Sequence, residues 1–400
     1  MEHRNDAAVI SLETCPGCGK SAFTPLYTIP WERHVSVVCC ENCALVFQTT
    51  PLSTAELEKY YRTNSTFHLH GPGTRHESLI TARHAFLKDV LTLIPQTTSK
   101  RSVLDVGCGF GDFLASFDEQ NWNRTGIELN AERASFARSE LNLHVFERPL
   151  ESPDIAPESI NLLCAFGVIE HMYDIRTVLS SMHNCLAPGG LGMLSVADLA
   201  SPERGISDYF CVEHILNFCT ETLESVVRAA GFTVIKTGPL TPPDYKDICC
   251  IFRKENTEFN WYGMEPAPVL AQQLVHDVLS YIPKRQQYIE TIRQRLDSAG
   301  IFAEDLKLGI YGAGAHTRQL LEGVPELQNT SVFFDSDPAK RGRKFENGTI
   351  NSLDDISTMQ LDAVLISSKA FENEILQMLT QRLPQAIRII PLYRDFGDAS

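Results

Sequence analysis

Two closely spaced cysteine pairs near the start of the chain could bind a metal ion. Cys15 and Cys18 lie in "CPGCGK", and Cys40 and Cys43 lie in "VCCENCALVF", with 21 residues between the pairs. Two such turns facing each other supply four thiolates in the tetrahedral arrangement that suits Zn²⁺. Four protein ligands leave no open coordination position, so the ion is expected to be structural. Cys39 is the alternative to Cys40 if the register is shifted by one residue.

A small ribbon domain, residues 1–52, is expected around this metal site. About fifty residues bury too little apolar surface to fold alone, so metal binding would supply the folding energy. Gly19 fits the first cysteine turn, whereas Ala44 occupies the equivalent place in the second. The cysteines outside this cluster lie in apolar runs such as "INLLCAF", which is typical of small core residues.

A glycine-rich turn indicates a second ligand site. The stretch "VLDVGCGFGDFL" predicts a buried strand, then Gly107, Gly109 and Gly111, then a helix. Dinucleotide-binding turns usually read GxGxxG and hold a pyrophosphate against the helix N-terminus. Here the spacing is GxGxG, and Asp105 precedes the first glycine by two residues, where its carboxylate would repel a pyrophosphate. The turn therefore favours a cationic ligand without phosphate, and S-adenosylmethionine (SAM) fits this description.

Residues further along the chain agree with a SAM site. Glu128 ends the next predicted strand, "NRTGIELN", where an acid can accept hydrogen bonds from both ribose hydroxyls. Leu150 and Glu151 follow a third strand and are placed to contact an adenine ring. The fourth strand, "INLLCAF", leads to Gly167, Glu170 and His171 at the carboxyl edge of the sheet.

The pieces "LDVGCGFG", "GIELN", "FGVIEHM" and "LAPGGLGMLSV" occur in order, and over about residues 80–255 the chain resembles the class I SAM-dependent methyltransferases. The resemblance implies an α/β fold with a seven-stranded, mostly parallel sheet and helices on both faces. "FTVIKTGPL" and "DICCIFRKE" would form its antiparallel edge. It also implies that Asp105, Gly107 and Gly109 line the methionine end of SAM and that Glu128 binds the ribose.

A second glycine turn, "LGIYGAGAHTRQLL", begins another strand–helix alternation. Gly312 and Gly314 precede a helix expected from about Ala315, while Thr317 replaces the third glycine of GxGxxG. Asp335 ends the next strand, about where a ribose-binding acid would lie. The unit has only about 100 residues and lacks a second mononucleotide half, which argues against binding of a whole dinucleotide.

The order of ribbon, methyltransferase and smaller Rossmann-like domain is similar to that of the sugar C-methyltransferases. In that family the last domain helps to hold the nucleotide portion of a nucleotide-linked sugar. The resemblance implies the same here, with a diphosphate meeting Lys340, Arg341, Arg343 and Lys344; a solvated loop is the alternative. The N-terminal motif also looks like that of bacterial methyltransferases acting in sugar, surface-polysaccharide or natural-product pathways.

Methyl transfer needs a nucleophile in line with the sulfonium and a base that removes its proton. His171 is one candidate, and Glu213 and His214, after the fifth strand, are others. Sugar C-methyltransferases carry Tyr-His-Glu-His at the latter place, whereas this chain reads "CVEH", so the tyrosine proposed to act as a base is missing. Tyr209 could substitute for it. Alternatively, Glu213 and His214 pair only to brace a loop.

Elements between these motifs complete the predicted organisation. Residues 53–100 form a helical linker with a helix from about His76 to Ile94, and residues 257–304 form a helical connector. The methyltransferase domain spans residues 101–256 and the C-terminal domain residues 305–400. A polar stretch of the linker is either a solvated connection or a lid that faces ligand with Tyr60, Tyr61, His68 and His70.

The net charge of −15 argues against a broad nucleic-acid or anionic-membrane surface. No apolar stretch approaches the roughly 20 residues needed to cross a bilayer, and no signal peptide is recognisable, so we expect a cytoplasmic protein. The predicted function is SAM-dependent methylation of a nucleotide-linked sugar or related activated small molecule, with His/Glu-assisted deprotonation. A glycan or natural-product acceptor and a non-catalytic SAM-binding assembly subunit are the alternatives. The methylated atom and the oligomeric state stay open.

Overall fold

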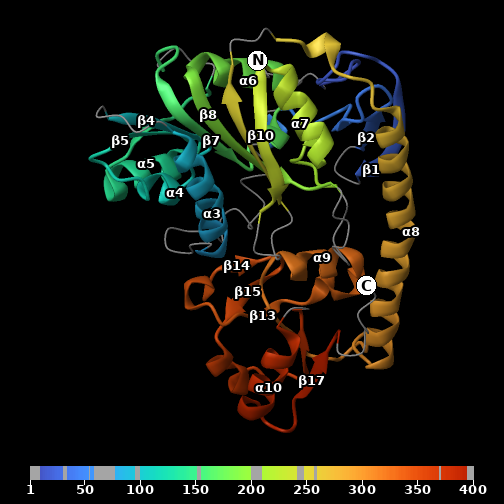
Figure 1. Cartoon of the computed structure of the whole chain (residues 1–400). Helices are drawn as coiled ribbons and strands as arrows, with labels where there is room; N and C mark the ends of the chain where they lie inside the picture. The colour runs from blue at the N-terminus through green and yellow to red at the C-terminus, as the bar shows by residue number, and fades with distance from the viewer. Residues whose placement is uncertain are drawn as a thin grey trace, which may run out of the picture. The chain divides into compact units, whose positions relative to one another are not determined.

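The computed structural model (Figure 1) describes residues 10–29, 34–53, 55–57, 77–94, 100–150, 155–199, 210–240, 247–255, 259–368 and 371–393. The chain forms two compact units, and the boundary between them lies between Val278 and Leu279. Six residues predicted to lie at the site or in a lid fall outside the described residues: Tyr60, Tyr61, His68, His70, Glu151 and Tyr209.

The N-terminal ribbon in the first unit is a small antiparallel sheet. Its strands are β1 (Phe23–Ile29), β2 (Val35–Cys40) and β3 (Val46–Gln48), joined by β9 (Leu216–Asn217) in the order β1-β2-β3-β9. Val46 lies opposite Asn217 and Phe47 opposite Leu216, so a segment from far along the chain completes the ribbon sheet.

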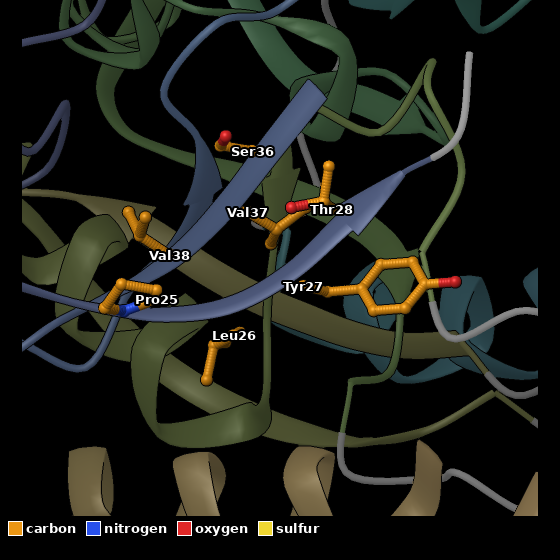
Figure 2. A pocket seen from close by; sticks show the side chains of 7 residues that line it. All are labelled: Pro25, Leu26, Tyr27, Thr28, Ser36, Val37 and Val38. Atoms are coloured by element: carbon orange, nitrogen blue, oxygen red, sulfur yellow. The ribbon is translucent and has the colours of Figure 1, made fainter. Parts of the chain in front are cut away.

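A hollow lies along β1 and β2 of the ribbon (Figure 2). The Tyr27 side chain extends away from Pro25 and Val38 in this view. Its ring contacts that of Phe210, with the centroids 5.8 Å apart. None of the predicted site residues lines this hollow, whose lining consists of Pro25, Leu26, Tyr27, Thr28, Ser36, Val37 and Val38.

The central sheet of the first unit has seven strands in the order β10-β11-β8-β7-β4-β5-β6. Strand β11 is antiparallel to both β10 and β8, and the other pairings are parallel, which confirms the predicted fold and its antiparallel edge. The strands are β4 (Arg101–Val106), β5 (Trp122–Ile127), β6 (His144–Phe146), β7 (Ile160–Phe166), β8 (Leu186–Ala197), β10 (Phe232–Pro239) and β11 (Asp247–Lys254).

Apolar side chains of the central strands alternate between two cores, one on each face of the sheet. Leu104 and Leu163 belong to one core, whereas their neighbours Val103 and Leu162 belong to the other. This alternation follows from the period of two in an extended strand, and it buries both faces as expected for a mostly parallel sheet.

Helices cover both faces of this sheet (Figure 1). Helices α6 (Ile175–Cys185) and α7 (Thr220–Ala229) contribute buried residues to the core of Leu104. The opposite core receives residues of α3 (Glu77–Leu93), α4 (Asp112–Ala115) and α5 (Ala131–Leu141). The first unit also contains the short helices η1 (Ile169–His171) and η2 (Trp261–Gly263).

Helix α8 (Pro268–Ser298) belongs to the first unit up to Val278 and to the second unit from Leu279. The second unit holds a six-stranded sheet of order β14-β15-β13-β12-β16-β17, parallel except for β14, which confirms a second sheet domain. Its elements are β12 (Leu308–Tyr311), α9 (Ala315–Gly323), η3 (Pro325–Asn329), β13 (Val332–Phe334), η4 (Pro338–Lys340), β14 (Lys344–Phe345), β15 (Gly348–Asn351), η5 (Leu353–Thr358), β16 (Ala363–Ile366), α10 (Glu372–Arg382) and β17 (Arg388–Pro391). No described helix combines the length and the apolar composition that crossing a bilayer would need.

Gly192 in β8 is required by the packing of its neighbour. It lies directly opposite Phe252 of β11, and a Cβ atom added at Gly192 would overlap the Phe252 ring. Gly192→Ala is therefore expected to lower the free energy of unfolding by about 1–3 kcal/mol, because the ring must leave its rotamer. Urea unfolding followed by circular dichroism measures the change. Gly238→Ala on β10, where an added Cβ would meet no atom within 4 Å, is the matched control. Equal unfolding midpoints for the two variants would contradict the prediction.

Candidate active site

The first glycine turn has a backbone that other residues adopt with difficulty. Gly107, Gly109 and Gly111 have φ angles of +72°, +59° and +84°, all in the left-handed region. A Cβ atom at Gly107 would lie 2.6 Å from Val168 Cγ2, and one at Gly111 would overlap Leu143. At Gly109, by contrast, an added Cβ meets no atom within 4 Å. The turn is thus closely packed at its two ends and open at its centre, where a ligand can approach the backbone.

Asp105 supplies a buried carboxyl group immediately before this turn. Its side chain is only 3% exposed, and burial raises the pKa of the carboxyl group to about 7. The Arg83 guanidinium opposes this rise in pKa, and the Glu128 carboxylate adds to it. A cationic ligand at this carboxyl group would favour its ionised form. The environment therefore suits the ammonium-bearing end of SAM and disfavours a phosphate.

Glu128 connects the end of β5 to the glycine turn. Its Oε2 accepts a hydrogen bond from the Gly109 backbone N–H at 2.9 Å, and its Oε1 accepts one from Asn130 N–H at 2.8 Å. A carboxylate offers about four lone-pair positions, so each oxygen keeps capacity for a ribose hydroxyl. Leu150, which is buried after β6, was the other predicted contact to the nucleoside.

The predicted histidines come together after β7 and before β9. Gly167, with φ +67°, turns the chain into η1, which presents Glu170 and His171. The His171 and His214 rings lie edge to face, with centroids 5.0 Å apart. One ring nitrogen of each histidine and one Glu170 carboxylate oxygen lie within 4.8 Å of one another. The cluster thus combines two proton-accepting groups with a buried carboxyl group.

Hydrogen bonding and burial set the proton positions in this cluster. His171 Nδ1 lies 2.8 Å from the Glu213 carbonyl oxygen, which can only accept, so Nδ1 carries the proton and Nε2 is the proton acceptor. Burial lowers the pKa of His171, although the carbonyl and the Glu213 carboxylate oppose this. Burial raises the pKa of Glu170 to about 8. At neutral pH, His171 is therefore an uncharged imidazole able to take up a proton.

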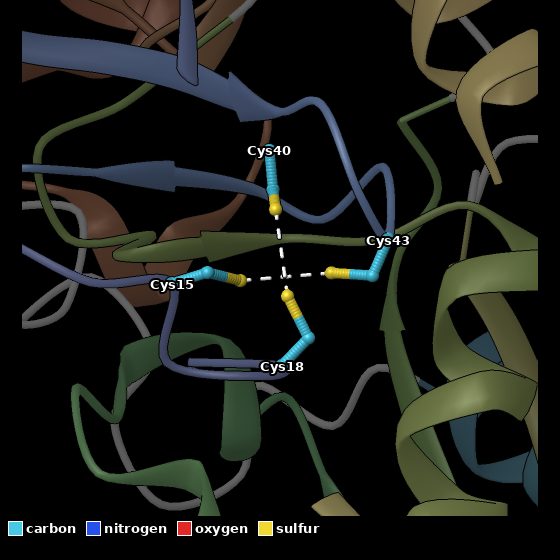
Figure 3. Close-up of side chains that lie close together, drawn as sticks. All are labelled: Cys15, Cys18, Cys40 and Cys43. Atoms are coloured by element: carbon cyan, nitrogen blue, oxygen red, sulfur yellow. Dashed lines mark hydrogen bonds between the residues drawn. The ribbon is translucent and has the colours of Figure 1, made fainter. Parts of the chain in front are cut away.

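The four predicted metal ligands converge on one point (Figure 3). Cys15 Sγ lies 3.6 Å from Cys43 Sγ, and Cys18 Sγ lies 3.6 Å from Cys40 Sγ. All four sulfur atoms lie within 4.8 Å of one another and are buried. A tetrahedral Zn²⁺ with Zn–S bonds near 2.3 Å separates its sulfur ligands by about 3.8 Å, so this donor set fits the ion.

The structure places Cys40, and not Cys39, in the cluster. Cys39 Sγ lies 3.7 Å from the Ala44 carbonyl, and burial raises the pKa of its thiol to about 12. Both cysteine turns use a left-handed residue, Gly19 at φ +76° and Ala44 at φ +62°. Ala44 therefore adopts the conformation for which glycine is preferred.

The second glycine turn repeats one feature of the first. Asp335 Oδ2 accepts a hydrogen bond from Ala313 N–H at 3.1 Å, as Glu128 does from Gly109. Gly312 has φ +107°, and a Cβ there would lie 2.7 Å from the Ser367 carbonyl.

Two of the four basic residues predicted to contact a diphosphate, Lys340 and Arg341, already have carboxylate partners. Lys340 Nζ lies 2.8 Å from Asp335 Oδ2, and Arg341 contacts Asp355 at 3.1 Å. Lys344 is exposed on β14, and Arg343 directly precedes that strand. A diphosphate would have to compete with Asp335 for Lys340.

Gln48 is a residue near the site that the sequence analysis did not single out. It lies in β3 and is completely buried, and its side-chain amide donates hydrogen bonds into the segment that carries Glu213 and His214. The signal available in the sequence was a polar side chain at the end of an otherwise apolar strand, "VFQ".

Two segments of the chain match known protein families. Residues 79–237 match a family described as "Methyltransferase domain", and residues 304–390 match one described as "C2185-like, N-terminal". The central sheet has the Rossmann-like fold of class I SAM-dependent methyltransferases.

Individual relatives match only parts of the chain. A ubiquinone biosynthesis O-methyltransferase from Pseudomonas syringae pv. tomato is 27% identical over 123 residues, covering 29% of this chain and 53% of that protein. Its counterpart from Pseudomonas aeruginosa is 26% identical over 122 residues, covering 29% and 52%. The chain thus spans about half the length of these curated relatives. Among solved structures, the 1,6-didemethyltoxoflavin-N1-methyltransferase of Burkholderia thailandensis with S-adenosylhomocysteine matches at 22% identity and a TM-score of 0.41, covering 58% of this chain and 99% of that one.

Proposed function

We propose that this protein is a SAM-dependent methyltransferase that methylates a nucleotide-linked sugar or a related activated small molecule. The observation that carries the proposal is the convergence of His171 and His214, which follow β7 and precede β9. Asp105 lies in β4 of the same sheet, the glycine turn follows that strand, and Glu128 follows β5. A cofactor-binding turn and proton-accepting side chains in one domain are the two requirements of methyl transfer.

Different residues of the chain bind the cofactor and accept the proton. SAM supplies an electrophilic methyl group when it is bound. Asp105 compensates the positive charge of its amino-acid end, and Glu128 binds its ribose hydroxyls. His171 accepts the proton of the acceptor group through Nε2, because Nδ1–H is engaged by the Glu213 carbonyl.

The acceptor class is supported by the three-part organisation of the chain. The Asp335–Ala313 contact in the second unit resembles the Glu128–Gly109 contact, and this likeness supports nucleotide binding by that unit. The curated relatives are named ubiquinone biosynthesis O-methyltransferases, and the solved neighbour is named a 1,6-didemethyltoxoflavin-N1-methyltransferase. These names favour O- or N-methylation as much as C-methylation. A surface glycan or natural product is therefore the second candidate acceptor.

A structural Zn²⁺ completes the proposal. Cys15, Cys18, Cys40 and Cys43 would hold it in the ribbon, because four buried sulfur atoms at this spacing need a cation to coexist as thiolates.

Glu128→Gln is expected to weaken S-adenosylhomocysteine binding about 10- to 100-fold, because neutral amide oxygen replaces a charged acceptor of two ribose hydroxyls. Isothermal titration calorimetry measures the affinity, and Asp105→Asn tests the other end of the ligand. Asp335→Asn changes the corresponding acid of the second unit and serves as the matched control, with unchanged affinity. Wild-type affinity in both Glu128→Gln and Asp105→Asn would contradict the assignment of this site.

The activity itself is tested with methyl-labelled SAM and a panel of nucleotide sugars that includes keto-sugars. Mass spectrometry of a labelled product establishes the reaction, and fragmentation places the methyl group on carbon, oxygen or nitrogen. If protein that binds S-adenosylhomocysteine labels none of the panel, the nucleotide-sugar assignment is wrong. The same assay is then run on lipid-linked glycans and phenolic natural products.

A further inference from the structure

We infer that Gln48 positions the segment that carries Glu213 and His214, so that the metal-binding ribbon forms part of the framework of the acceptor site. Gln48 acts through this segment and is a positioning residue. The inference rests on the proposed function for its consequence in catalysis, but its structural core can be tested without any methyl acceptor.

The side-chain amide of Gln48 is the centre of the contact. Its Nε2 lies 3.0 Å from the carbonyl oxygen of Cys211, 3.2 Å from that of Val212 and 3.0 Å from that of His214. Three carbonyl oxygens can only accept, so the NH₂ group must face them, and the opposite amide orientation would place oxygen against oxygen. One side chain thus contacts three carbonyl groups within four residues of the segment.

The ribbon also holds both ends of this segment. At its start, the ring of Phe210 packs against that of Tyr27 on β1. At its end, the backbone N–H of Gln48 donates to the Ile215 carbonyl at 2.9 Å, and Phe47 pairs with Leu216. Strand pairing fixes the end, and the ring contact fixes the start. Between them, the Gln48 amide, the His171 ring and a hydrogen bond from His214 N–H to the Cys211 carbonyl hold the backbone.

Burying the polar side chain of Gln48 costs free energy, which its hydrogen bonds to the segment offset. Its side chain is 0% exposed, and Oε1 has no hydrogen-bond partner in the part of the chain that the structure describes. An apolar side chain of similar volume would pack in β3 without leaving a buried polar atom unsatisfied. Replacing it, however, would remove one donor from each of three carbonyl groups, of which Cys211 O keeps the hydrogen bond from His214 N–H and His214 O keeps the one from Asn217 Nδ2.

The position of this segment controls the histidine cluster. The Glu213 carbonyl oxygen accepts a hydrogen bond from His171 Nδ1–H, and the His214 ring lies edge to face with the His171 ring. Both interactions depend on where the backbone of residues 211–214 runs. A displacement of about 1 Å in catalytic groups is enough to lower a rate about 10²-fold.

Cys211 provides a direct measurement of the segment's position. It is half-exposed, whereas each of the other eleven cysteines is buried. In Gln48→Met, which keeps the approximate volume and removes the donors, we expect alkylation of Cys211 by iodoacetamide to accelerate on the order of tenfold, because the segment opens more often. Peptide mass spectrometry assigns the modified cysteine. Zinc content and S-adenosylhomocysteine affinity should stay unchanged. Gln48→Asn keeps the donor group but shortens its reach, so it should increase the alkylation rate of Cys211 by a smaller factor. This variant replaces Gln48→Met in the experiment if Gln48→Met does not fold.

Thr49→Val is the matched control in the adjacent position. The Thr49 hydroxyl donates to the Ser36 carbonyl at 3.4 Å, a contact confined to the ribbon. This variant should alkylate at the wild-type rate. A wild-type alkylation rate at Cys211 in both Gln48 variants would overturn the inference. So would a parallel loss of zinc and of S-adenosylhomocysteine affinity, because that result would indicate a general packing role.

Measuring kcat and the KM for SAM distinguishes failure of this inference from failure of the proposed function. With an active acceptor, Gln48→Met should lower kcat about 10- to 100-fold while the KM for SAM is retained. If the protein methylates no acceptor, the proposed function fails, yet the alkylation rates still decide whether Gln48 positions residues 211–214. If methyl transfer is found and kcat is unchanged in Gln48→Met, the positioning role is wrong.

Discussion

His171→Asn is expected to lower kcat by roughly 10²- to 10⁴-fold, the usual contribution of a positioned general base. Asparagine can still donate a side-chain N–H to the Glu213 carbonyl, which His171 Nδ1 contacts at 2.8 Å, but it offers no basic nitrogen in place of Nε2. The substitution thus removes the proton acceptor and retains the local hydrogen bond. Steady-state kinetics with labelled SAM measures kcat, and calorimetry should show unchanged S-adenosylhomocysteine affinity.

The pH dependence gives this prediction a second readout. Burial lowers the pKa of His171 below its ordinary value of 6.5, so the imidazole stays uncharged, and able to accept a proton, at neutral pH and somewhat below it. The wild-type rate should therefore fall only at pH values below 6.5, and this fall should be missing from the residual activity of His171→Asn.

His214→Asn tests the other member of the pair, and its kcat should also fall. His144→Asn alters an exposed histidine on β6 and serves as the control, with kcat unchanged. If neither His171→Asn nor His214→Asn changes kcat, both residues are removed from the mechanism and the cluster is structural.

Cys43→Ser is expected to abolish zinc binding and, through the ribbon, most of the activity. Under the zinc proposal, loss of one of four thiolates opens the coordination sphere and removes the folding energy that the ion would supply to the ribbon. Metal analysis after exhaustive dialysis should find about one Zn²⁺ per wild-type chain and nearly none in the variant. Thermal unfolding should begin at a lower temperature.

Cys39→Ala is the control for this experiment, because Cys39 precedes Cys40 directly but lies outside the sulfur cluster. It should retain zinc and activity. Loss of zinc in Cys39→Ala would show that Cys39 is a ligand in place of Cys40, as in the shifted register. A metal-free wild-type protein with a folded ribbon would disprove the zinc proposal altogether.

Much of the fold could be predicted because it depends on local patterns. Alternating apolar residues around Leu104 and Leu163 indicate strands with two buried faces, and the glycine spacing after Asp105 marks the turn at which β4 ends. The two CxxC pairs similarly predict a four-thiol cluster, although only the structure distinguishes Cys40 from Cys39. The carboxyl-edge rule for parallel strands also placed His171 near the site.

Other features depend on contacts between distant segments and carry little local signal. Strand β9 has two residues, Leu216 and Asn217, too few for any periodicity, and it forms only because β3 offers an unpaired edge. The role of Gln48 depends on carbonyl groups, which every residue possesses. The tetrapeptide "APGG" contains proline and two glycines, yet it lies within β8, where pairing with β7 shifts register between Leu186 and Leu191.

The membership of β9 in the ribbon sheet has a consequence for biosynthesis. A ribosome completes β3 well before it reaches Leu216, so the nascent ribbon exposes an unpaired strand edge while most of the central sheet is being translated. Such edges are templates for pairing with other chains. Early metal capture by the four cysteines would hold the hairpin in shape during this interval. Cells starved of zinc should accordingly accumulate aggregated newly made chains rather than inactive soluble protein.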